Sequence, residues 1–309
     1  MLSNALQYFK ALSDATRLRL VLVLRRYELN VNELVELLGM GQSRVSRHLK
    51  ILASTGLLGS RRDGLWVFYS IAAEGPGRDF IEAVYPFLYA GDSAREDLAL
   101  ASGIVEERTS RTSRFFNRIA EDWEAMSGKL LGAFSLPLAV EVFLPERCRV
   151  AVDLGCGPGN MLERLLAHAD EVIGVDGSAR MLELARRRFG GYGERLSLRI
   201  GDLEHLPLRD GEADFICLNL VLHHLSNPKA ALLEIKRVLG QGGIFLLSEF
   251  GKHEDESLRR EYGDLWLGFD LALLEGLLEE AGFGRLSVHS HALESGLSIN
   301  LVRATASGG

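Results

Sequence analysis

Residues 152–159 read Val-Asp-Leu-Gly-Cys-Gly-Pro-Gly, an apolar segment that runs directly into three glycines at alternate positions. The apolar pattern predicts a buried strand over 150–154, followed by a glycine loop and an amphipathic helix over 160–169. The same order repeats further along the chain. Strand patterns over 171–176, 213–218 and 244–249 alternate with helical patterns over 179–189 and 229–239. This alternation predicts a parallel sheet with helices on both faces.

The spacing of the loop glycines disfavours a dinucleotide cofactor. A dinucleotide-binding loop has the spacing G-x-G-x-x-G, whereas the third glycine here comes one residue early and Asn160 takes its place. Asp176 ends the second predicted strand, where a carboxylate can accept hydrogen bonds from two vicinal ribose hydroxyls. The loop and the acid together predict a site for a ribose-containing cofactor.

The first 60 residues have a different pattern, of short helices. Apolar spacing predicts helices over 3–12 and 14–26, and Asn30 with Glu33 resembles a capping box that opens a helix through Leu38. After the turn Gly39-Met40-Gly41, a further helix is expected over 42–54, ending before Gly56. Two short helices joined by a glycine-containing turn predict a helix-turn-helix.

The helix over 42–54 is the predicted DNA-recognition helix. Val45, Leu49 and Leu52 share one face and are expected in the core. The opposite face carries polar and basic side chains that suit either DNA recognition or an ordinary solvated surface. The residues expected to contact bases are Gln42, Ser43, Ser46 and Arg47, and those expected to contact mainly phosphates are Arg44, His48 and Lys50.

A hairpin is predicted after this helix. Asp63-Gly64 is a strong turn signal between flanks rich in β-branched and aromatic residues. Arg61 and Arg62 would lie at its tip, within reach of the phosphate backbone. The segment is therefore predicted to be a winged helix-turn-helix.

Charge and composition agree with this division. Residues 1–72 hold ten Lys or Arg and five acids, whereas the remainder has a net charge of −12. The basic segment is compatible with a nucleic-acid partner, although ordinary fluctuation in surface charge would give the same count. Residues 1–7 lack the pattern of a signal peptide, and no apolar run approaches the ~18 residues of a membrane span. Three scattered cysteines predict a reducing, cytoplasmic setting.

Two stretches of the first segment resemble the ArsR-type repressors: residues 12–20, Leu-Ser-Asp-Ala-Thr-Arg-Leu-Arg-Leu, and residues 43–52, Ser-Arg-Val-Ser-Arg-His-Leu-Lys-Ile-Leu. The resemblance implies a homodimer that binds a two-fold symmetric double-stranded DNA operator. Many metal-sensing members carry Cys-Val-Cys where this chain has Asn30-Val31-Asn32. Residues 1–147 contain no Cys, and their single histidine is His48, so no metal site is expected.

The second segment resembles the class I S-adenosylmethionine-dependent methyltransferases. The resemblance rests on residues 153–159, Gly174-Val-Asp-Gly-Ser178, Gly201-Asp-Leu203, residues 213–218 and the turn 239–243. It implies a seven-stranded sheet that ends in an antiparallel hairpin over 286–291 and 297–303. S-adenosylmethionine or S-adenosylhomocysteine is the implied cofactor, with no metal. The implied cofactor-binding residues are Asp153, Gly155, Gly157, Gly159, Asp176, Gly177, Met181, Asp202, Leu203 and Asn219.

Together these patterns predict an α/β protein with an N-terminal winged helix-turn-helix domain and a C-terminal Rossmann-like, seven-stranded methyltransferase domain. The expected boundaries are 1–74 for the DNA-binding domain, 75–110 for a connector and 111–309 for the cofactor-binding domain. Residues 75–80 are expected to break the pattern, a helix is expected from about Asp79 to Tyr89, and the helix over 93–110 is expected to join the dimer. Helical spacing then continues to Met126, with an apolar stripe from Phe115 and Phe116 to Trp123 that is expected to pack in the core rather than contact a ligand.

The sequence leaves two functions open. His223 and His224 follow the strand over 213–218 and are candidate general bases, although a structural role is the favoured interpretation. Amino-methylating relatives carry Asn or Asp, two prolines and an aromatic residue where this chain has Asn219-Leu-Val-Leu222, which disfavours nucleobase methylation. Arsenite methylation would need several thiolates and is rejected. The layout resembles ArsR-type regulators fused to a methyltransferase domain, which implies a ligand-responsive repressor of methionine-cycle genes or an active methyltransferase on a small-molecule acceptor.

Overall fold

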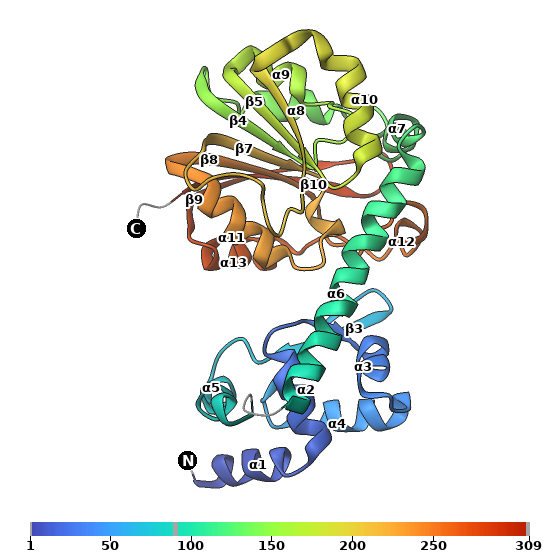
Figure 1. The fold of residues 1–309 in the computed structure, drawn as a ribbon, viewed down its shortest axis with the longest axis vertical. Helices are drawn as coiled ribbons and strands as arrows, with labels where there is room; N and C mark the ends of the chain where they lie inside the picture. Colours follow the sequence, from blue (N-terminus) through green and yellow to red (C-terminus); the bar gives the residue numbers. More distant parts are fainter. Residues whose placement is uncertain (1, 89–91, 307–309) are drawn as a thin grey trace. The chain divides into compact units, whose positions relative to one another are not determined.

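Helix α6 (Asp92–Ile119) begins in one structural unit and ends in the next. The computed structural model describes residues 2–88 and 92–306, and the chain divides into the units Met1–Arg108 and Thr109–Gly309 (Figure 1). No helix in the described ranges is both long enough and apolar enough to cross a membrane.

The first unit is a winged helix-turn-helix. Asp14 caps α2 by accepting a hydrogen bond from the Arg17 amide (3.1 Å), and Asn30 and Glu33 form the predicted capping box at the start of α3. Gly39 ends α3 at φ +60°, which glycine adopts without strain. The helices are α1 (Leu2–Leu12), α2 (Ala15–Leu24), α3 (Val31–Leu38), α4 (Gln42–Ser54) and α5 (Pro76–Leu88), and the three-stranded sheet is β1 (Leu29–Asn30), β3 (Trp66–Ile71) and β2 (Leu58–Asp63).

Two expectations for the connector were wrong. The helix expected from about Asp79 begins earlier, because Pro76 starts α5 at a first-turn position whose amide needs no hydrogen-bond partner within the helix. The helical pattern to Met126 is not continuous either, since α6 ends at Ile119 and α7 (Trp123–Leu131) begins after a turn.

The first half of α6 packs on its own chain. Ala94, Leu98 and Ala101 are buried in the apolar core of the first unit. Arg19 holds the same stretch through a bidentate pair with Asp97, at 2.8 and 2.7 Å. This face of the helix is therefore not available to a second chain, and the dimer that was predicted through it stays a prediction.

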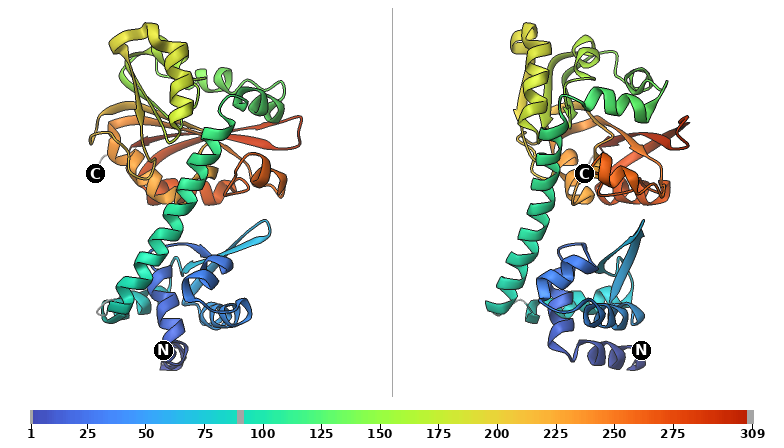
Figure 2. Two further views of the ribbon diagram at one scale, coloured as in Figure 1. Left: turned by 45° about the vertical axis from the view of Figure 1, so that its right-hand side comes forward. Right: turned by 90° about the vertical axis from the view of Figure 1, so that its right-hand side faces the viewer.

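The second unit is a seven-stranded mixed sheet with helices on both faces (Figures 1 and 2). The strand order is β6-β5-β4-β7-β8-β10-β9, and β10 runs antiparallel to both of its neighbours, as the resemblance implied. The strands are β4 (Cys148–Leu154), β5 (Ala169–Asp176), β6 (Leu196–Ile200), β7 (Ala213–Asn219), β8 (Leu239–Phe250), β9 (Phe283–Ala292) and β10 (Ser298–Ala306).

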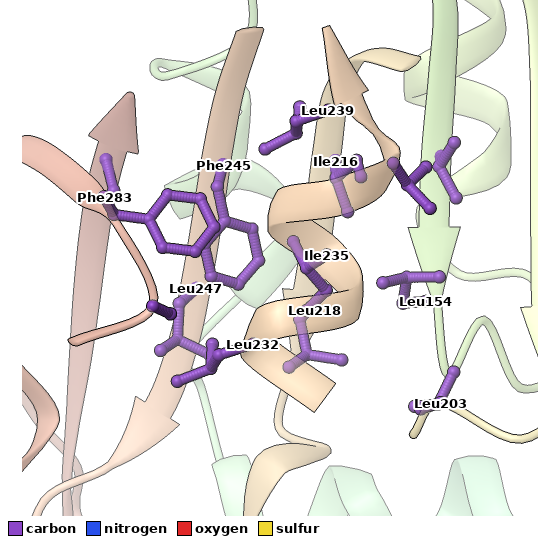
Figure 3. Close-up of a cluster of buried hydrophobic side chains, with 14 of the residues drawn as sticks. Leu154, Leu203, Ile216, Leu218, Leu232, Ile235, Leu239, Phe245, Leu247 and Phe283 are labelled. Carbon is purple, nitrogen blue, oxygen red and sulfur yellow. The ribbon is translucent and has the colours of Figure 1, made fainter. Parts of the chain in front are cut away.

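Residues of the five central strands enter two apolar cores, one on each face of the sheet. On β4, Val150, Val152 and Leu154 belong to one core, whereas Ala151 belongs to the other. Figure 3 shows part of the first core, where Phe245 and Phe283 lie side by side with ring centroids 5.2 Å apart. The helices of this unit are α7, α8 (Leu136–Glu141), α9 (Leu162–His168), α10 (Ala179–Phe189), α11 (Pro228–Val238), α12 (Ser257–Glu261) and α13 (Leu271–Glu280), with the 3-10 turns η1 (Gly190–Arg195) and η2 (Leu222–His224).

Candidate functional site

The carboxyl ends of β4, β5 and β7 open into a cavity of about 230 Å³. This is the edge where parallel α/β sheets ordinarily bind ligands. Nine of the ten residues that were predicted to bind the cofactor line it. They are Asp153, Gly155, Gly157, Asp176, Gly177, Met181, Asp202, Leu203 and Asn219.

Gly159, the tenth predicted residue, does not line the cavity. It adopts φ +96°, and a Cβ added there would lie 2.6 Å from Phe189 and 2.9 Å from Leu162. The glycine therefore allows the loop to pack closely against α9 and α10, which is a structural role.

Asp176 fixes the shape of the glycine loop. Its Oδ2 accepts a hydrogen bond from the Gly157 amide (2.8 Å), and its Oδ1 accepts one from the Ser178 amide (2.7 Å). Burial raises the pKa of Asp176 to about 6, although these two amide hydrogen bonds oppose the rise. Each oxygen keeps a second lone pair, so the carboxylate can hold the loop and still accept a ligand hydroxyl.

Asp153 lies beneath the loop, almost fully buried. The Cys217 Sγ lies 3.4 Å from its Oδ1. Burial raises the pKa of Asp153 to about 7, opposed by hydrogen bonds from Cys217 and Asn219. A bound cation in the cavity would therefore find a carboxyl group here that ionises readily near neutral pH.

The far end of the cavity is formed by the turn after β6. Asp202 is partly exposed, and its Oδ1 accepts a hydrogen bond from the Glu204 amide at 2.9 Å. Leu203 is buried and contributes an apolar surface beside it. An acid next to an apolar side chain suits a flat ring with polar edges, as the resemblance implied for adenine.

The opposite wall of the cavity comes from α6, α7 and α8, and sequence reasoning missed it. Phe116 and Trp123 line the cavity with their rings edge to face, 5.4 Å apart. The apolar stripe that contains them was expected to pack in the core, because helical spacing reports burial and does not distinguish a core from a cavity wall. The remaining lining residues from these helices and their connections are Thr109, Thr112, Ser113, Ser127, Leu131, Leu136 and Pro137.

The two candidate histidines have different positions. His223 lies behind the cavity, where its Nδ1 is 2.5 Å from Glu249 Oε1 and its amide donates to Glu249 Oε2 (3.1 Å). Although burial lowers the pKa of His223, the charges of Glu249 and Asp264 and the Glu249 hydrogen bond raise it to about 9. These contacts therefore favour the protonated form of His223, paired with Glu249.

His224 lines the cavity. Its Nδ1 lies 3.3 Å from the Gly263 carbonyl, and its ring meets Phe116 edge to face with centroids 4.8 Å apart. Burial and the neighbouring charge of His223 lower the pKa of His224 well below its usual value. Of the two candidate bases, only His224 lines the cavity, and the lowered pKa favours its neutral form.

His223, His224 and Asp264 also form a buried group of possible metal ligands. One ligand atom from each lies within 4.8 Å of the other two, and neither carboxylate oxygen of Asp264 has a hydrogen-bond partner. A ligating histidine commonly donates its other nitrogen to a carboxylate, as His223 does to Glu249. However, coordination by His224 through Nδ1 would break its contact with Gly263.

The candidate DNA-binding face lies on α4 of the first unit. Val45, Leu49 and Leu52 are fully buried, as predicted. Six of the seven polar residues of this helix that were predicted to contact DNA are exposed, and Arg62 is exposed beside the turn of the β2–β3 hairpin. The exposed residues of α4 are Gln42, Ser43, Arg44, Ser46, Arg47 and Lys50.

Two predicted DNA contacts have other partners in the structure. The side chain of His48 is only 17% exposed, and its Nδ1 lies 3.7 Å from the capping Asp14. Arg61 is not free at the hairpin tip, because it forms a bidentate pair with Glu28 (3.2 and 2.9 Å) and lies over the Phe68 ring. Arg61 stabilises the fold of the first unit through these contacts, whereas His48 Nδ1 lies near Asp14 without a hydrogen bond. Sequence spacing could not show either neighbour, because both are distant in sequence.

Comparison with protein families finds two matches, one in each unit. A family described as "Bacterial regulatory protein, arsR family" matches residues 14–60, and one described as "Methyltransferase domain" matches residues 152–247.

Curated relatives resemble parts of the chain. An uncharacterised 37.1 kDa protein in a transposon of Streptomyces fradiae is 39% identical over 37% of this chain and 33% of its own length. Demethylmenaquinone methyltransferase of Symbiobacterium thermophilum is 28% identical over 57% of this chain and 73% of its own length. The chain thus spans only about a third of the first relative.

Solved structures agree on the fold of the second unit. The [4+2]-cyclase SpnF superposes with a TM-score of 0.54 at 18% identity, covering 65% of this chain and 97% of that one. A phosphoethanolamine N-methyltransferase of Haemonchus contortus superposes with a TM-score of 0.54 at 17% identity, covering 64% of this chain and 60% of that one. Because one neighbour is described as a cyclase and the other as a methyltransferase, the shared fold leaves the reaction open.

The sequence matches and the fold agree for each unit. The chain therefore carries an arsR-family helix-turn-helix domain in its first unit and a methyltransferase domain of the class I fold in its second.

Proposed function

We propose that this chain is a DNA-binding transcriptional regulator whose methyltransferase domain binds S-adenosylmethionine or S-adenosylhomocysteine as an effector. The nine predicted residues that line the cavity are the proposed cofactor site, and the exposed face of α4 with Arg62 is the proposed DNA contact. The regulated genes would be those of the methionine cycle, with the chain as their repressor.

The observation that carries this proposal is the position of Arg108 and Thr109 on α6. The Arg108 guanidinium lies 2.6 Å from Glu33 Oε1 and donates to the Glu28 carbonyl (3.1 Å). Glu33 is the capping-box residue of α3, the first helix of the helix-turn-helix. The next residue, Thr109, lines the cavity of the second unit. A ligand that orders this part of α6 would act on the same helix that holds α3.

We also propose that the chain acts as a homodimer on a two-fold symmetric operator. Among the exposed large apolar side chains of the first unit, three lie on α1 and α5: Leu6 (56%) and Phe9 (61%) on α1, and Phe87 (82%) on α5. The two helices meet where Phe9 contacts Phe80, with ring centroids 5.1 Å apart. This surface, and not the buried face of α6, is the proposed dimer contact.

Fluorescence anisotropy with DNA from the chain's own promoter tests the proposal. Operator affinity is measured at fixed salt without ligand and with each ligand, for the wild type and for Asp176→Ala. The wild type should show a change of about fivefold or more with one ligand, and Asp176→Ala should show none. Asp170→Ala is the matched control, because Asp170 is an exposed acid at the other end of β5. Unchanged regulation in Asp176→Ala would contradict the proposal.

A second candidate function is methyl transfer to a small molecule. It is favoured by the neutral His224 ring in the cavity, which could accept a proton from an acceptor. In that case the DNA-binding unit would control the chain's own expression. Formation of S-adenosylhomocysteine that depends on an added acceptor and is lost in His224→Phe would support this function.

A further inference from the structure

The cavity has two chemically different halves. The strand ends and the glycine loop form the half assigned above to the cofactor. The other half is formed by α6, α7 and α8 and presents mainly apolar side chains: Phe116, Trp123, Leu131, Leu136 and Pro137. Such a wall gains free energy by covering an apolar or aromatic molecule.

The charges of the cavity all have one sign. Four of its lining residues carry carboxyl groups. Within the described part of this unit, no lining residue is Lys or Arg. The four are Asp153, Asp176, Asp202 and Glu204. A carboxylate or phosphate on a ligand would lose its hydration on entering the cavity and would find no cationic side chain to pair with. It would also be repelled by these four acids, so binding of anionic molecules is disfavoured.

His224 adds one directional contact between the two halves. Because a carbonyl oxygen can only accept, the contact with Gly263 places the His224 proton on Nδ1. The remaining nitrogen, Nε2, then carries a lone pair and accepts hydrogen bonds. The ring stands against Phe116, so a molecule on the apolar wall can place a donor within its reach.

We infer that the half of the cavity formed by α6, α7 and α8 is a subsite for an uncharged small molecule with an apolar, preferably aromatic, body and a hydroxyl or N–H group that donates to His224. The inference rests on the proposed function in assigning the other half to S-adenosylmethionine or S-adenosylhomocysteine. It applies equally to a methyl acceptor and to a second effector.

Three naphthalenes of similar size test the subsite by calorimetry on the full-length chain saturated with S-adenosylhomocysteine, at about pH 7.5. The first, 2-naphthol, is uncharged and has a donor. The second, 2-methoxynaphthalene, lacks the donor, and the third, 2-naphthoate, is an anion. We expect 2-naphthol to bind tightest, 2-methoxynaphthalene about fivefold more weakly, and 2-naphthoate at least about thirtyfold more weakly.

Two variants separate the contributions. His224→Phe keeps a ring against Phe116 but removes Nε2, so 2-naphthol and 2-methoxynaphthalene should bind within about twofold of each other. Ser127→Lys places a cation in the wall and should strengthen 2-naphthoate binding about tenfold over Ser127→Ala, which adds no charge.

The inference is overturned if 2-naphthoate binds the wild type as tightly as 2-naphthol, or if S-adenosylhomocysteine binds and none of the naphthalenes does. A chain that binds no S-adenosylhomocysteine would refute the proposed function instead. S-adenosylhomocysteine and the naphthalenes are therefore titrated separately as well as together.

Discussion

Replacement of Glu249 by Gln should destabilise the second unit in a way that depends on pH. In the wild type, the pair with Glu249 and the charge of Asp264 raise the pKa of His223 from 6.5 to about 9, against the effect of burial. A shift of this size corresponds to about 3 kcal/mol of folding stability. The variant would leave His223 buried without its hydrogen-bonded counter-ion, so most of this stability should be lost.

The sign follows from the direction of the shift. Since the folded pKa of His223 lies above the unfolded one, the stabilisation is fully present below pH 6.5 and disappears as pH rises through about 9. The expected loss in Glu249→Gln is therefore up to about 3 kcal/mol below pH 6.5, and it falls to less than about 1 kcal/mol above pH 9.

Urea unfolding followed by tryptophan fluorescence measures this loss. A Trp66→Phe background removes the tryptophan of the first unit, so that Trp123 and Trp266 report on the second. Glu280→Gln is the matched control, because Glu280 forms an exposed ion pair with Lys229 and should change stability by less than about 1 kcal/mol. A loss in Glu249→Gln that is the same at pH 6.5 and pH 9 would refute the reasoning.

Three further predictions concern ligand and DNA binding. Arg108→Ala removes the pair with Glu33 and should reduce the ligand-dependent change in operator affinity to less than about twofold, with unchanged S-adenosylhomocysteine affinity in calorimetry; a full response would contradict the role of α6. Gly159→Ala should lower stability by about 2–4 kcal/mol in thermal unfolding, because the added Cβ would overlap Phe189 and the residue would keep a positive φ. An unfolding midpoint equal to that of the wild type would show that the loop accommodates the Cβ at no cost. Arg47→Ala should weaken operator binding by about 1–3 kcal/mol per half-site in anisotropy at fixed salt, and unchanged affinity would exclude α4 as the reading helix.

Much of the fold could be predicted because local signals determine it. Helix α4 begins and ends where the apolar spacing and Gly56 indicate, and α10 spans its predicted residues 179–189. The order of strands and helices in the second unit follows from alternating buried segments and glycine loops. These features depend on neighbours within a few positions, which is the range that periodicity and capping report.

The candidate site could be predicted only in part. The residues of the glycine loop and the strand ends line the cavity, because a strand followed by glycines fixes their place at the sheet edge. Phe116 and Trp123 were assigned to the core, since an apolar stripe does not show what covers it. Arg61 and His48 were assigned to DNA, because their partners Glu28 and Asp14 meet them only in the folded chain.

The central claim is that the cavity and the DNA-binding unit are energetically coupled, and reciprocal calorimetry tests it most directly. The Kd of S-adenosylmethionine and of S-adenosylhomocysteine is measured on the free chain and on the chain saturated with its own promoter DNA, at one salt concentration. Coupling requires the Kd of one ligand to change by the same factor by which that ligand changes operator affinity, about fivefold or more. Equal Kd values with and without DNA for both ligands would contradict the account.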